Sequence, residues 1–208
     1  MRDEFKNSPN WHNRGYMPHY NAHDKYQIIT YRLSDSLPKK VFEKIELKFT
    51  QEEKLKRRRE IEIQMDRGYG SCLLKNYECA KIIIDNWKYF DRKRYDLISY
   101  VVMPNHVHLL IRSYNFEIGY LVKSWKSYSA KAIRKYYASL TNAECHSALQ
   151  EQTSILQKGN PFWQREYWDR FIRDEKHFRY AINYIHENPV KAGLVQTPIQ
   201  WPFSSSNN

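Results

Sequence analysis

Residues 95–112 read YDLISYVVMPNHVHLLIR and contain two predicted β-strands. Both Tyr95–Met103 and His106–Arg112 are rich in the β-branched, aromatic and apolar residues that favour strands. Pro104 and Asn105 separate the two segments and predict a tight connection between them. The stretch therefore predicts two successive strands of a sheet.

The segments on either side add another strand and several helices. Tyr26–Leu33 is the first predicted strand. Helical patterns occupy residues 38–66, 76–90, 116–140 and 175–187. We expect Asp174 to cap the last helix and Pro189 to prevent its continuation. This order favours an α+β fold with helices on one face of an antiparallel sheet, and one further strand within residues 161–173 would complete a ferredoxin-like arrangement.

The charge balance favours a polyanionic partner. Lys and Arg total 34 against 23 Asp and Glu, which gives a formal net charge of +11 and a pI near 9.4. Nucleic acid is the first candidate, and a solvated basic surface is the alternative. Aromatic residues make up 15% of the chain and include 17 Tyr, which suits stacking on unpaired bases, although ordinary core packing uses the same residues.

The cysteines and the hydropathy pattern limit the cellular context. Cys72, Cys79 and Cys145 form neither an even set nor a pair with metal-site spacing. They therefore argue against a disulfide framework or a cysteine zinc site and fit a reducing cytoplasm. No apolar run approaches the roughly 20 residues that a membrane span requires. We expect a soluble cytoplasmic protein that is nucleoid-associated when bound to DNA and has no membrane partner.

Two histidines in the second of the paired strands form a candidate metal site. Side chains in a strand alternate between faces, so His106 and His108 should project from the same face. Imidazole nitrogen binds several divalent ions, and oxygen ligands should complete the site for a hard ion such as Mg²⁺. The alternative for His-x-His is a surface pair or a hydrogen-bonded pair near the core.

The last predicted helix carries a candidate nucleophile. Tyr180, Tyr184 and Asn188 are spaced four residues apart, so they share one helix face. An amide oxygen from Asn188 at the helix end can complete a metal site, and a phenol oxygen can attack a phosphorus atom. The alternatives are an amphipathic core tyrosine and a helix-ending asparagine before proline.

The predicted helix at 116–140 supplies candidate contacts to DNA. Its cationic side chains suit phosphates and its aromatic rings suit unpaired bases, although a solvated helix face around an apolar stripe is equally consistent. The candidates are Lys123, Trp125, Lys126, Tyr128, Lys131 and Arg134.

Blocks along nearly the whole chain resemble one protein family. The segment YVVMPNHVHLLI at 100–111 resembles the HUH motif of single-tyrosine transposases. Other blocks, in the same order along the chain, are similar to segments of the REP-associated tyrosine transposases. These blocks are WHNRGY at 11–16, ITYRL at 29–33, SLP at 36–38, FWQREYWDRFIRD at 162–174, YIHENPVKAGLV at 184–195 and WPFSS at 201–205.

The resemblance implies a fold and a set of site residues. The fold would be the ferredoxin-like HUH nuclease architecture with the histidines on a central strand. By position, His106 and His108 would hold Mg²⁺ or Mn²⁺, Asn188 would complete the metal site and Tyr184 would be the nucleophile. Tyr180 is the nearest rival nucleophile, but its offset from Asn188 fits the family pattern less well.

The implied activity is metal-dependent cleavage and rejoining of single-stranded DNA near hairpins, through a 5′-phosphotyrosine intermediate. The partner would be single-stranded DNA with REP-like hairpins. The arm around Trp11, Arg14 and Tyr16 would contact the foot of a hairpin. A monomer acting in cis is favoured, with a homodimer as the alternative. The general base for Tyr184 is not identified by the sequence.

The expected organisation is an arm at 1–24, a transposase domain at 25–195 and a tail at 196–208. The domain would contain a helical insertion at about 39–66 and a loop insertion at about 136–160. Two other function classes remain as alternatives. One is a domesticated, non-catalytic protein that binds hairpins or single strands, and the other is a structural metal or RNA-binding module.

Overall fold

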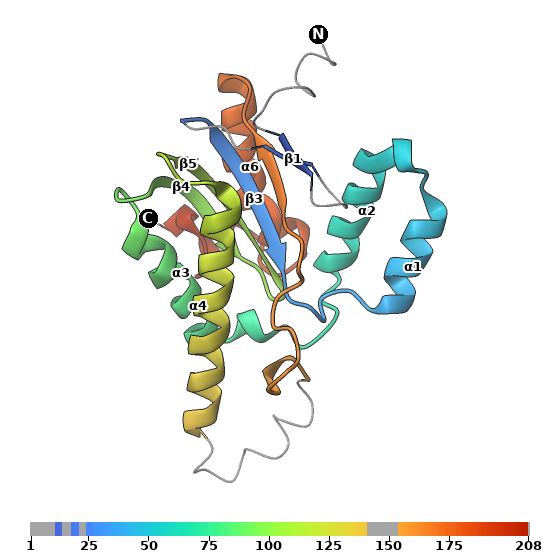
Figure 1. Ribbon diagram of the computed structural model, residues 1–208, viewed down its shortest axis with the longest axis vertical. Helices are drawn as coiled ribbons and strands as arrows, with labels where there is room; N and C mark the ends of the chain where they lie inside the picture. The colour runs from blue at the N-terminus through green and yellow to red at the C-terminus, as the bar shows by residue number, and fades with distance from the viewer. Residues whose placement is uncertain (1–10, 14–17, 21–23, 141–153, 208) are drawn as a thin grey trace.

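The computed structural model describes residues 11–13, 18–20, 24–140 and 154–207 (Figure 1). Arg14 and Tyr16, two of the expected hairpin contacts, lie outside the described residues. Trp11 belongs to the short strand β1 (Trp11–Asn13), which pairs with β2 (Pro18–Tyr20) in a two-stranded antiparallel sheet.

A four-stranded antiparallel sheet forms the centre of the fold. Its strands are β3 (Tyr26–Arg32), β4 (Tyr95–Val102), β5 (His106–Ser113) and β6 (Trp168–Phe171). Their order across the sheet is β4-β5-β3-β6, and every neighbouring pair is antiparallel. The strand expected within residues 161–173 is therefore present as β6.

Two helices complete the ferredoxin-like unit. The helix α3 (Tyr77–Phe90) connects β3 to β4, and α4 (Ile118–Ser139) connects β5 to β6. The Asn76 side chain caps α3 by accepting hydrogen bonds from the backbone N–H groups of Glu78 and Cys79. The chain thus follows the β-α-β-β-α-β order of that arrangement, as the sequence predicted.

Helices cover both faces of the sheet, so the expectation of helices on one face is wrong. Cross-strand partners share a face, and the pairs Tyr31–Val107 and Thr30–His108 lie on opposite faces. The Tyr31 ring contacts Trp87 of α3, whereas the His108 ring contacts Tyr184 of α6. Figure 1 accordingly shows α3 and α4 in front of the sheet and α6 behind it.

The helix α6 (Glu175–Lys191) is longer than expected. The Asp174 carboxylate accepts a hydrogen bond from the His177 N–H at 2.7 Å, which confirms the predicted N-cap. Pro189 does not end the helix. Proline removes one backbone donor, and the next turns still close because the Ala192 N–H donates to the Asn188 carbonyl and the Leu194 N–H to the Pro189 carbonyl.

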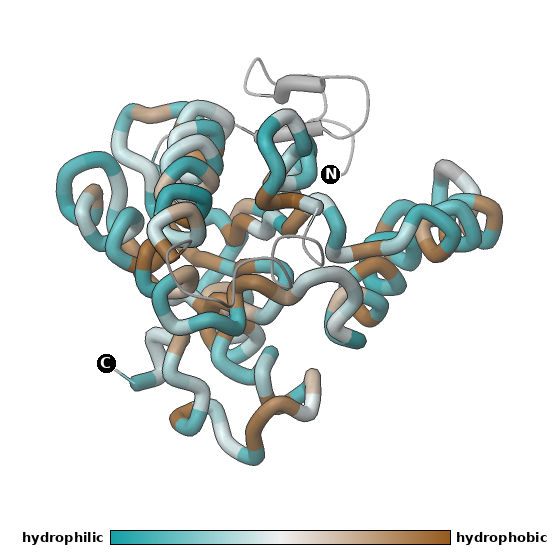
Figure 2. Tube along the Cα trace, turned by 90° about the horizontal axis from the view of Figure 1, so that it is seen from below, coloured by the Kyte–Doolittle hydropathy of each residue, from teal (hydrophilic) through white to brown (hydrophobic). Residues whose placement is uncertain are grey.

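The charged segment after β3 folds into two helices, α1 (Lys39–Lys48) and α2 (Lys54–Asp66). Together they project from one side of the domain (Figures 1 and 2). Their buried side chains form a small separate core that reaches the sheet at Trp168 of β6. The members of this core are Leu37, Ile45, Ile61, Met65 and Trp168.

The final residues pack against the edge strand β4. The Trp201 indole N–H donates to the Val102 carbonyl at 2.9 Å, and Ser204 forms a β-bridge with Val101. Short 3-10 turns lie at Gln51–Glu53, Leu73–Lys75, Ser154–Leu156, Pro198–Gln200 and Ser205–Asn207. No helix in the described part of the chain has the length and apolar character needed to cross a bilayer.

Candidate active site

His106 and His108 lie on the α6 side of strand β5. Both side chains are 1% exposed, and their rings meet edge to face with centroids 4.8 Å apart. The two-residue spacing therefore brings both imidazoles to one point on the sheet, as the strand geometry predicts.

Asn105 fixes the orientation of the His106 ring. The Asn105 amide N–H₂ donates to the backbone carbonyls of Met65 and Tyr69 at 3.1 and 3.0 Å. Its amide oxygen is therefore the atom that faces His106 Nδ1, at 2.8 Å, and it accepts a hydrogen bond from that nitrogen. This tautomer leaves a lone pair on His106 Nε2, the arrangement expected of a metal ligand held by an outer hydrogen bond.

Thr30 has the same relation to His108. Its hydroxyl oxygen lies 2.7 Å from His108 Nδ1, across the β3–β5 pair. When this hydroxyl accepts from Nδ1, His108 Nε2 keeps its lone pair as well. Each histidine is thus held through its Nδ1 atom, and in this tautomer the Nε2 atoms of both rings are able to accept a ligand.

Burial holds both imidazoles in the neutral form. It lowers the pKa of His106 to about 3, with a further contribution from the Arg32 charge. Burial also lowers the pKa of His108 well below its usual value, and His106, Arg58 and Lys191 lower it further. Neutral imidazole is the form that coordinates metal ions.

Tyr184 of α6 lies against His108, one member of the histidine pair. Its ring meets the His108 ring edge to face, with centroids 5.4 Å apart. Asn188, one turn later, is 3% exposed and donates from its amide to the Tyr184 carbonyl at 2.7 Å. The structure therefore brings together the two histidines, the tyrosine and the asparagine that the sequence singled out.

The surroundings of Tyr184 keep its phenol protonated. Burial raises its pKa above the usual value, and the Glu62 and Asp66 carboxylates raise it further. Arg58 and Asn188 act in the opposite direction. Loss of the phenol proton therefore requires help from a base or a cation.

The helix α2 closes one side of the site, which the sequence analysis missed. Its Asp66 carboxylate lies 3.7 Å from His106 Nε2, and burial raises the Asp66 pKa to about 6, with a further rise from Glu62. Arg58 pairs with Glu62 at 3.1 Å on the same helix. The charge run of α2 has the pattern of a solvated face, so only the fold brings these three side chains to Tyr184.

The residues fit a divalent ion through a mixed donor set. In the described ranges, no group of three or more His, Cys, Asp and Glu side chains converges as a metal site. The candidate donors are instead two imidazole nitrogens and the Asn188 amide oxygen, because the amide nitrogen of Asn188 donates to the Tyr184 carbonyl. Nitrogen and oxygen ligands together suit Mn²⁺, and Mg²⁺ when water supplies further oxygen atoms.

His186 is turned away from the Tyr184 phenol. Its ring nitrogen lies 3.0 Å from the Ser99 hydroxyl and 2.9 Å from the Ser205 hydroxyl. These partners belong to β4 and the C-terminal segment. His186 therefore holds the end of the chain against the sheet.

Three of the expected DNA contacts on α4 are engaged inside the protein. Trp125 is 1% exposed and packs against Tyr95, so its expected stacking on a base is wrong. Lys126 donates to the backbone carbonyls of residues 164–166. Arg134 donates to the carbonyls of Ile155 and Asn160. These two cations hold the segment before β6 and are not free for a phosphate.

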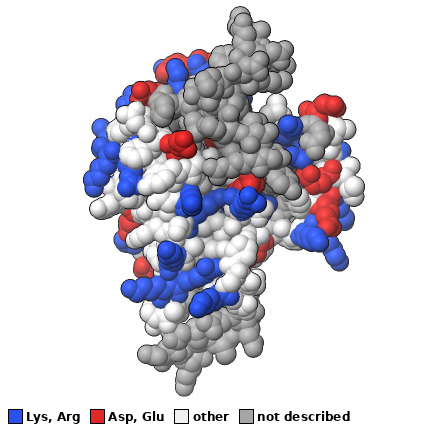
Figure 3. Space-filling view, in the orientation of Figure 1, with Lys and Arg blue, Asp and Glu red and all other residues white. Residues whose placement is uncertain are grey.

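The remaining α4 candidates are exposed. Lys123, Tyr128 and Lys131 face solvent, and α4 contains no acidic residue. Figure 3 shows Lys and Arg side chains gathered over this helix. The helix nevertheless covers the sheet face opposite Tyr184, so these residues are not part of the candidate active site.

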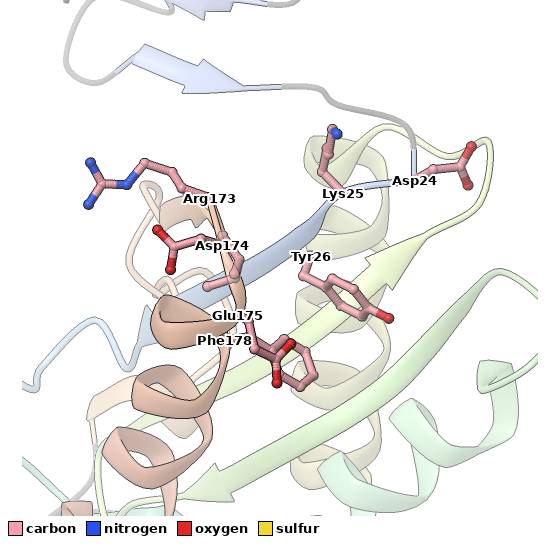
Figure 4. A pocket seen from close by; sticks show the side chains of 8 residues that line it. Asp24, Lys25, Tyr26, Arg173, Asp174, Glu175 and Phe178 are labelled. Atoms are coloured by element: carbon pink, nitrogen blue, oxygen red, sulfur yellow. The ribbon is translucent and has the colours of Figure 1, made fainter.

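A separate cleft of about 320 Å³ lies at the start of α6. The labelled residues in Figure 4 come from the start of β3 and from the turn into α6, and they include charges of both signs. Tyr26 pairs with Arg112 at this end of β3, whereas Arg32 pairs with His106 at the other end, about 20 Å away at roughly 3.3 Å per residue. The cleft is therefore distinct from the histidine site.

The relatives found by comparison with known proteins are named as REP-associated tyrosine transposases. Over 111 residues the chain is 29% identical to the "Putative REP-associated tyrosine transposase" of Haemophilus influenzae, covering 53% of this chain and 58% of that protein. Over 43 residues it is 44% identical to the REP-associated tyrosine transposase of Escherichia coli K12, covering 21% and 26%. The matches thus span less than two thirds of either relative.

A solved structure shares the fold. It is that of a REP-associated tyrosine transposase bound to a REP hairpin, with a TM-score of 0.53 and 18% sequence identity over 91% of this chain and 81% of that one. The model of the family described as "Transposase IS200 like" matches residues 77–188, more than half of the 208 residues. This segment includes the histidine pair, Tyr184 and Asn188. The chain belongs to the IS200-like transposase family.

Proposed function

We propose that this protein is a metal-dependent endonuclease and strand transferase that cuts and rejoins single-stranded DNA near hairpins through Tyr184. The contact between the Tyr184 and His108 rings carries this proposal, because it places a phenol beside two neutral imidazoles. The relatives named as tyrosine transposases support it.

The chemistry follows from this arrangement. The Tyr184 oxygen attacks the phosphorus of the scissile phosphate, and the bond from phosphorus to the 3′-oxygen breaks. The leaving 3′-oxygen takes up a proton, so the products are a 5′-phosphotyrosine and a strand with a free 3′-hydroxyl. Attack by a 3′-hydroxyl on the phosphotyrosine reverses the step and joins strands without a nucleotide cofactor.

His106, His108 and Asn188 would hold Mg²⁺ or Mn²⁺. A bound divalent ion would neutralise negative charge on the scissile phosphate and assist loss of the phenol proton. The outer hydrogen bonds from Asn105 and Thr30 would keep both imidazoles oriented.

The DNA partner would carry a REP-like hairpin beside the cleaved strand. The solved structure with this fold is bound to a REP hairpin, which supports that choice. Tyr184 and the histidines of one chain already lie together, which favours a monomer acting in cis. The exposed α4 cations Lys123 and Lys131 and the exposed ring of Tyr128 would contact DNA away from the cleaved phosphate.

The test uses hairpin-bearing single strands from the DNA flanking the gene, labelled at the 5′ or the 3′ end. Wild type, Tyr184→Phe and Tyr180→Phe are incubated with Mn²⁺, with Mg²⁺ or with EDTA and run on denaturing gels. We expect a metal-dependent covalent adduct that carries the 3′ label in wild type and Tyr180→Phe, and none in Tyr184→Phe. An adduct in Tyr184→Phe would overturn the assignment of the nucleophile.

A non-catalytic, hairpin-binding protein is the second candidate function. The burial of both histidines, at 1% exposure each, favours this alternative because access to them requires side chains to move. This alternative predicts tight binding of the same strands in EDTA with no adduct under any metal. Binding that survives EDTA without an adduct also fits a structural metal or RNA-binding module, and a preference for RNA strands in the same assay would favour the RNA-binding module.

A further inference from the structure

Two arginines from different elements lie on the side of the sheet that carries Tyr184. The Arg58 guanidinium of α2 lies over the Trp168 ring of β6, 5.7 Å from its centroid. Trp168 pairs with Thr30, and Arg170 is two residues further along the same strand. Arg170 therefore projects from the sheet face that carries His108 and Tyr184.

The positive charges at this place are crowded. Arg170 is exposed at the surface. The pKa of its guanidinium is lowered mainly by partial burial, and the charges of Arg58 and Arg173 lower it further. Within the described ranges, the Arg170 guanidinium has no hydrogen bond or ion pair, and Arg58 has its single partner in Glu62. The Glu62 carboxylate is the acidic group that interacts with Arg170, and it faces three cations, Arg58, Arg170 and Arg173. Such an excess of positive charge favours the binding of an anion.

An exposed aromatic ring completes the group. Tyr180 is 62% exposed, and its ring lies 19° from parallel to the Tyr184 ring, with centroids 6.4 Å apart. It also interacts electrostatically with Arg170. A ring beside guanidinium groups is the combination with which proteins bind unpaired nucleotides, through stacking on the base and contact with the phosphate.

We propose that Arg58, Arg170 and Tyr180 form a subsite for one nucleotide of single-stranded DNA next to Tyr184, with the guanidinium groups on its phosphate and the Tyr180 ring on its base. This inference rests on the proposed function for the position of the cleaved phosphate. It gives α2 a part in DNA binding, because the packing of Arg58 on Trp168 brings this helix to the site.

The phosphate contact is tested by binding without cleavage. A fluorescein-labelled hairpin with its flanking single strand is titrated with Tyr184→Phe protein in EDTA at several salt concentrations. Adding Arg170→Ala should weaken binding and lower the slope of log affinity against log salt by about 1. Arg179→Ala is the matched control, because Arg179 is exposed on α6 but pairs with Glu175. An unchanged slope in Arg170→Ala would overturn the phosphate contact.

The stacking contact is tested with abasic strands. Tyr180→Ala should lose between about fivefold and a hundredfold in affinity, whereas Tyr180→Phe should keep wild-type affinity. A series of strands with one abasic site moved stepwise along the sequence should contain one position at which Tyr180→Ala has no further effect. Equal losses at every position would show that Tyr180 does not stack on a defined base.

Failure of this inference and failure of the proposed function are distinguishable. A wild-type adduct together with unaltered binding in Arg170→Ala and Tyr180→Ala overturns the subsite and leaves the nuclease standing. Binding that depends on both residues, without any adduct, supports the subsite in a protein that holds strands and does not cut them.

Discussion

The Tyr184 ring meets the His108 ring edge to face at a centroid distance of 5.4 Å, and this contact joins α6 to the central strand β5. The Asn188 side chain, one turn later on α6, donates a hydrogen bond to the Tyr184 carbonyl. The nucleophile candidate is therefore positioned by the last turns of α6 and not by a loop. Changes in that turn should affect the candidate metal site and the helix together.

Replacing Asn188 should weaken metal binding and destabilise the fold. Asn188→Ala removes a buried amide, its hydrogen bond and a candidate oxygen ligand. We expect at least about a tenfold loss in Mn²⁺ affinity and about 1–2 kcal/mol lower unfolding free energy. Titration calorimetry and urea unfolding measure the two effects. Asn188→Asp keeps an oxygen and should retain Mn²⁺ binding, and equal Mn²⁺ affinity in Asn188→Ala would remove Asn188 from the site.

Asn105 and Thr30 should act as positioning residues for the histidines. Asn105→Ala and Thr30→Val each remove the partner of one Nδ1 atom, so the ring can rotate or change tautomer. We expect a loss of about 10–100-fold in Mn²⁺ affinity. Imidazole nitrogen chemical shifts in the metal-free protein should show the change of tautomer directly.

Thr30→Ser is the control for the second of these variants, because it keeps the hydroxyl group. It should bind Mn²⁺ as wild type does. Unchanged nitrogen shifts in Asn105→Ala would mean that the backbone alone orients the His106 ring.

The sequence was sufficient for the parts of the site that lie close together along the chain. Period-two alternation placed His106 and His108 on one face, and helical spacing aligned Tyr184 with Asn188. Both relationships are local, so secondary structure determines them. The meeting of β5 with α6 is a tertiary contact, and only the family resemblance predicted it.

The contribution of α2 and the face of α4 had no comparable local signal. Arg58 and Asp66 belong to a charge run whose helix is amphipathic only through its small core with Trp168. On α4, helical spacing placed Trp125 on the apolar stripe with Leu121 and Ile133, and the structure buries all three, so the error was to count Trp125 also as a DNA contact beside the exposed Tyr128. The position of α6 on the face of the sheet opposite α3 and α4 also depends on long-range packing, which a local pattern does not reveal.

The buried histidines should make stability depend on pH. In the folded protein the His106 pKa is lowered to about 3, whereas the unfolded chain keeps the usual value of about 6.5. Between these values the unfolded state binds more protons, so this contribution to stability is full above pH 6.5 and is lost as pH falls toward 3. The slope is at most about 1.4 kcal/mol per pH unit for each histidine.

Urea unfolding of the metal-free protein between pH 7.5 and about 4.5 measures this loss of stability, because the range spans the usual histidine pKa. His106→Gln cannot take up the proton and should show a shallower loss of stability than wild type. Identical slopes in the two proteins would mean that His106 becomes protonated in the folded state.

Gly70 should control the position of α2 over the site. Its φ is +84°, and a Cβ atom built there would lie 2.4 Å from the Asp35 carbonyl oxygen, while the next N–H, of Ser71, donates to the Asp35 carboxylate at 2.8 Å. Gly70→Ala therefore combines backbone strain with a clash against a rigid carbonyl, and we expect a loss of about 2–3 kcal/mol in unfolding free energy. Gly193→Ala isolates the strain, because φ is +69° there and nothing lies within 4 Å of the added Cβ. It should lose about 1 kcal/mol in unfolding free energy.

Equal losses in the two variants would show that the turn after α2 adjusts to the added methyl group. The contact between Gly70 and Asp35 would then not fix Asp66 and Arg58 at Tyr184.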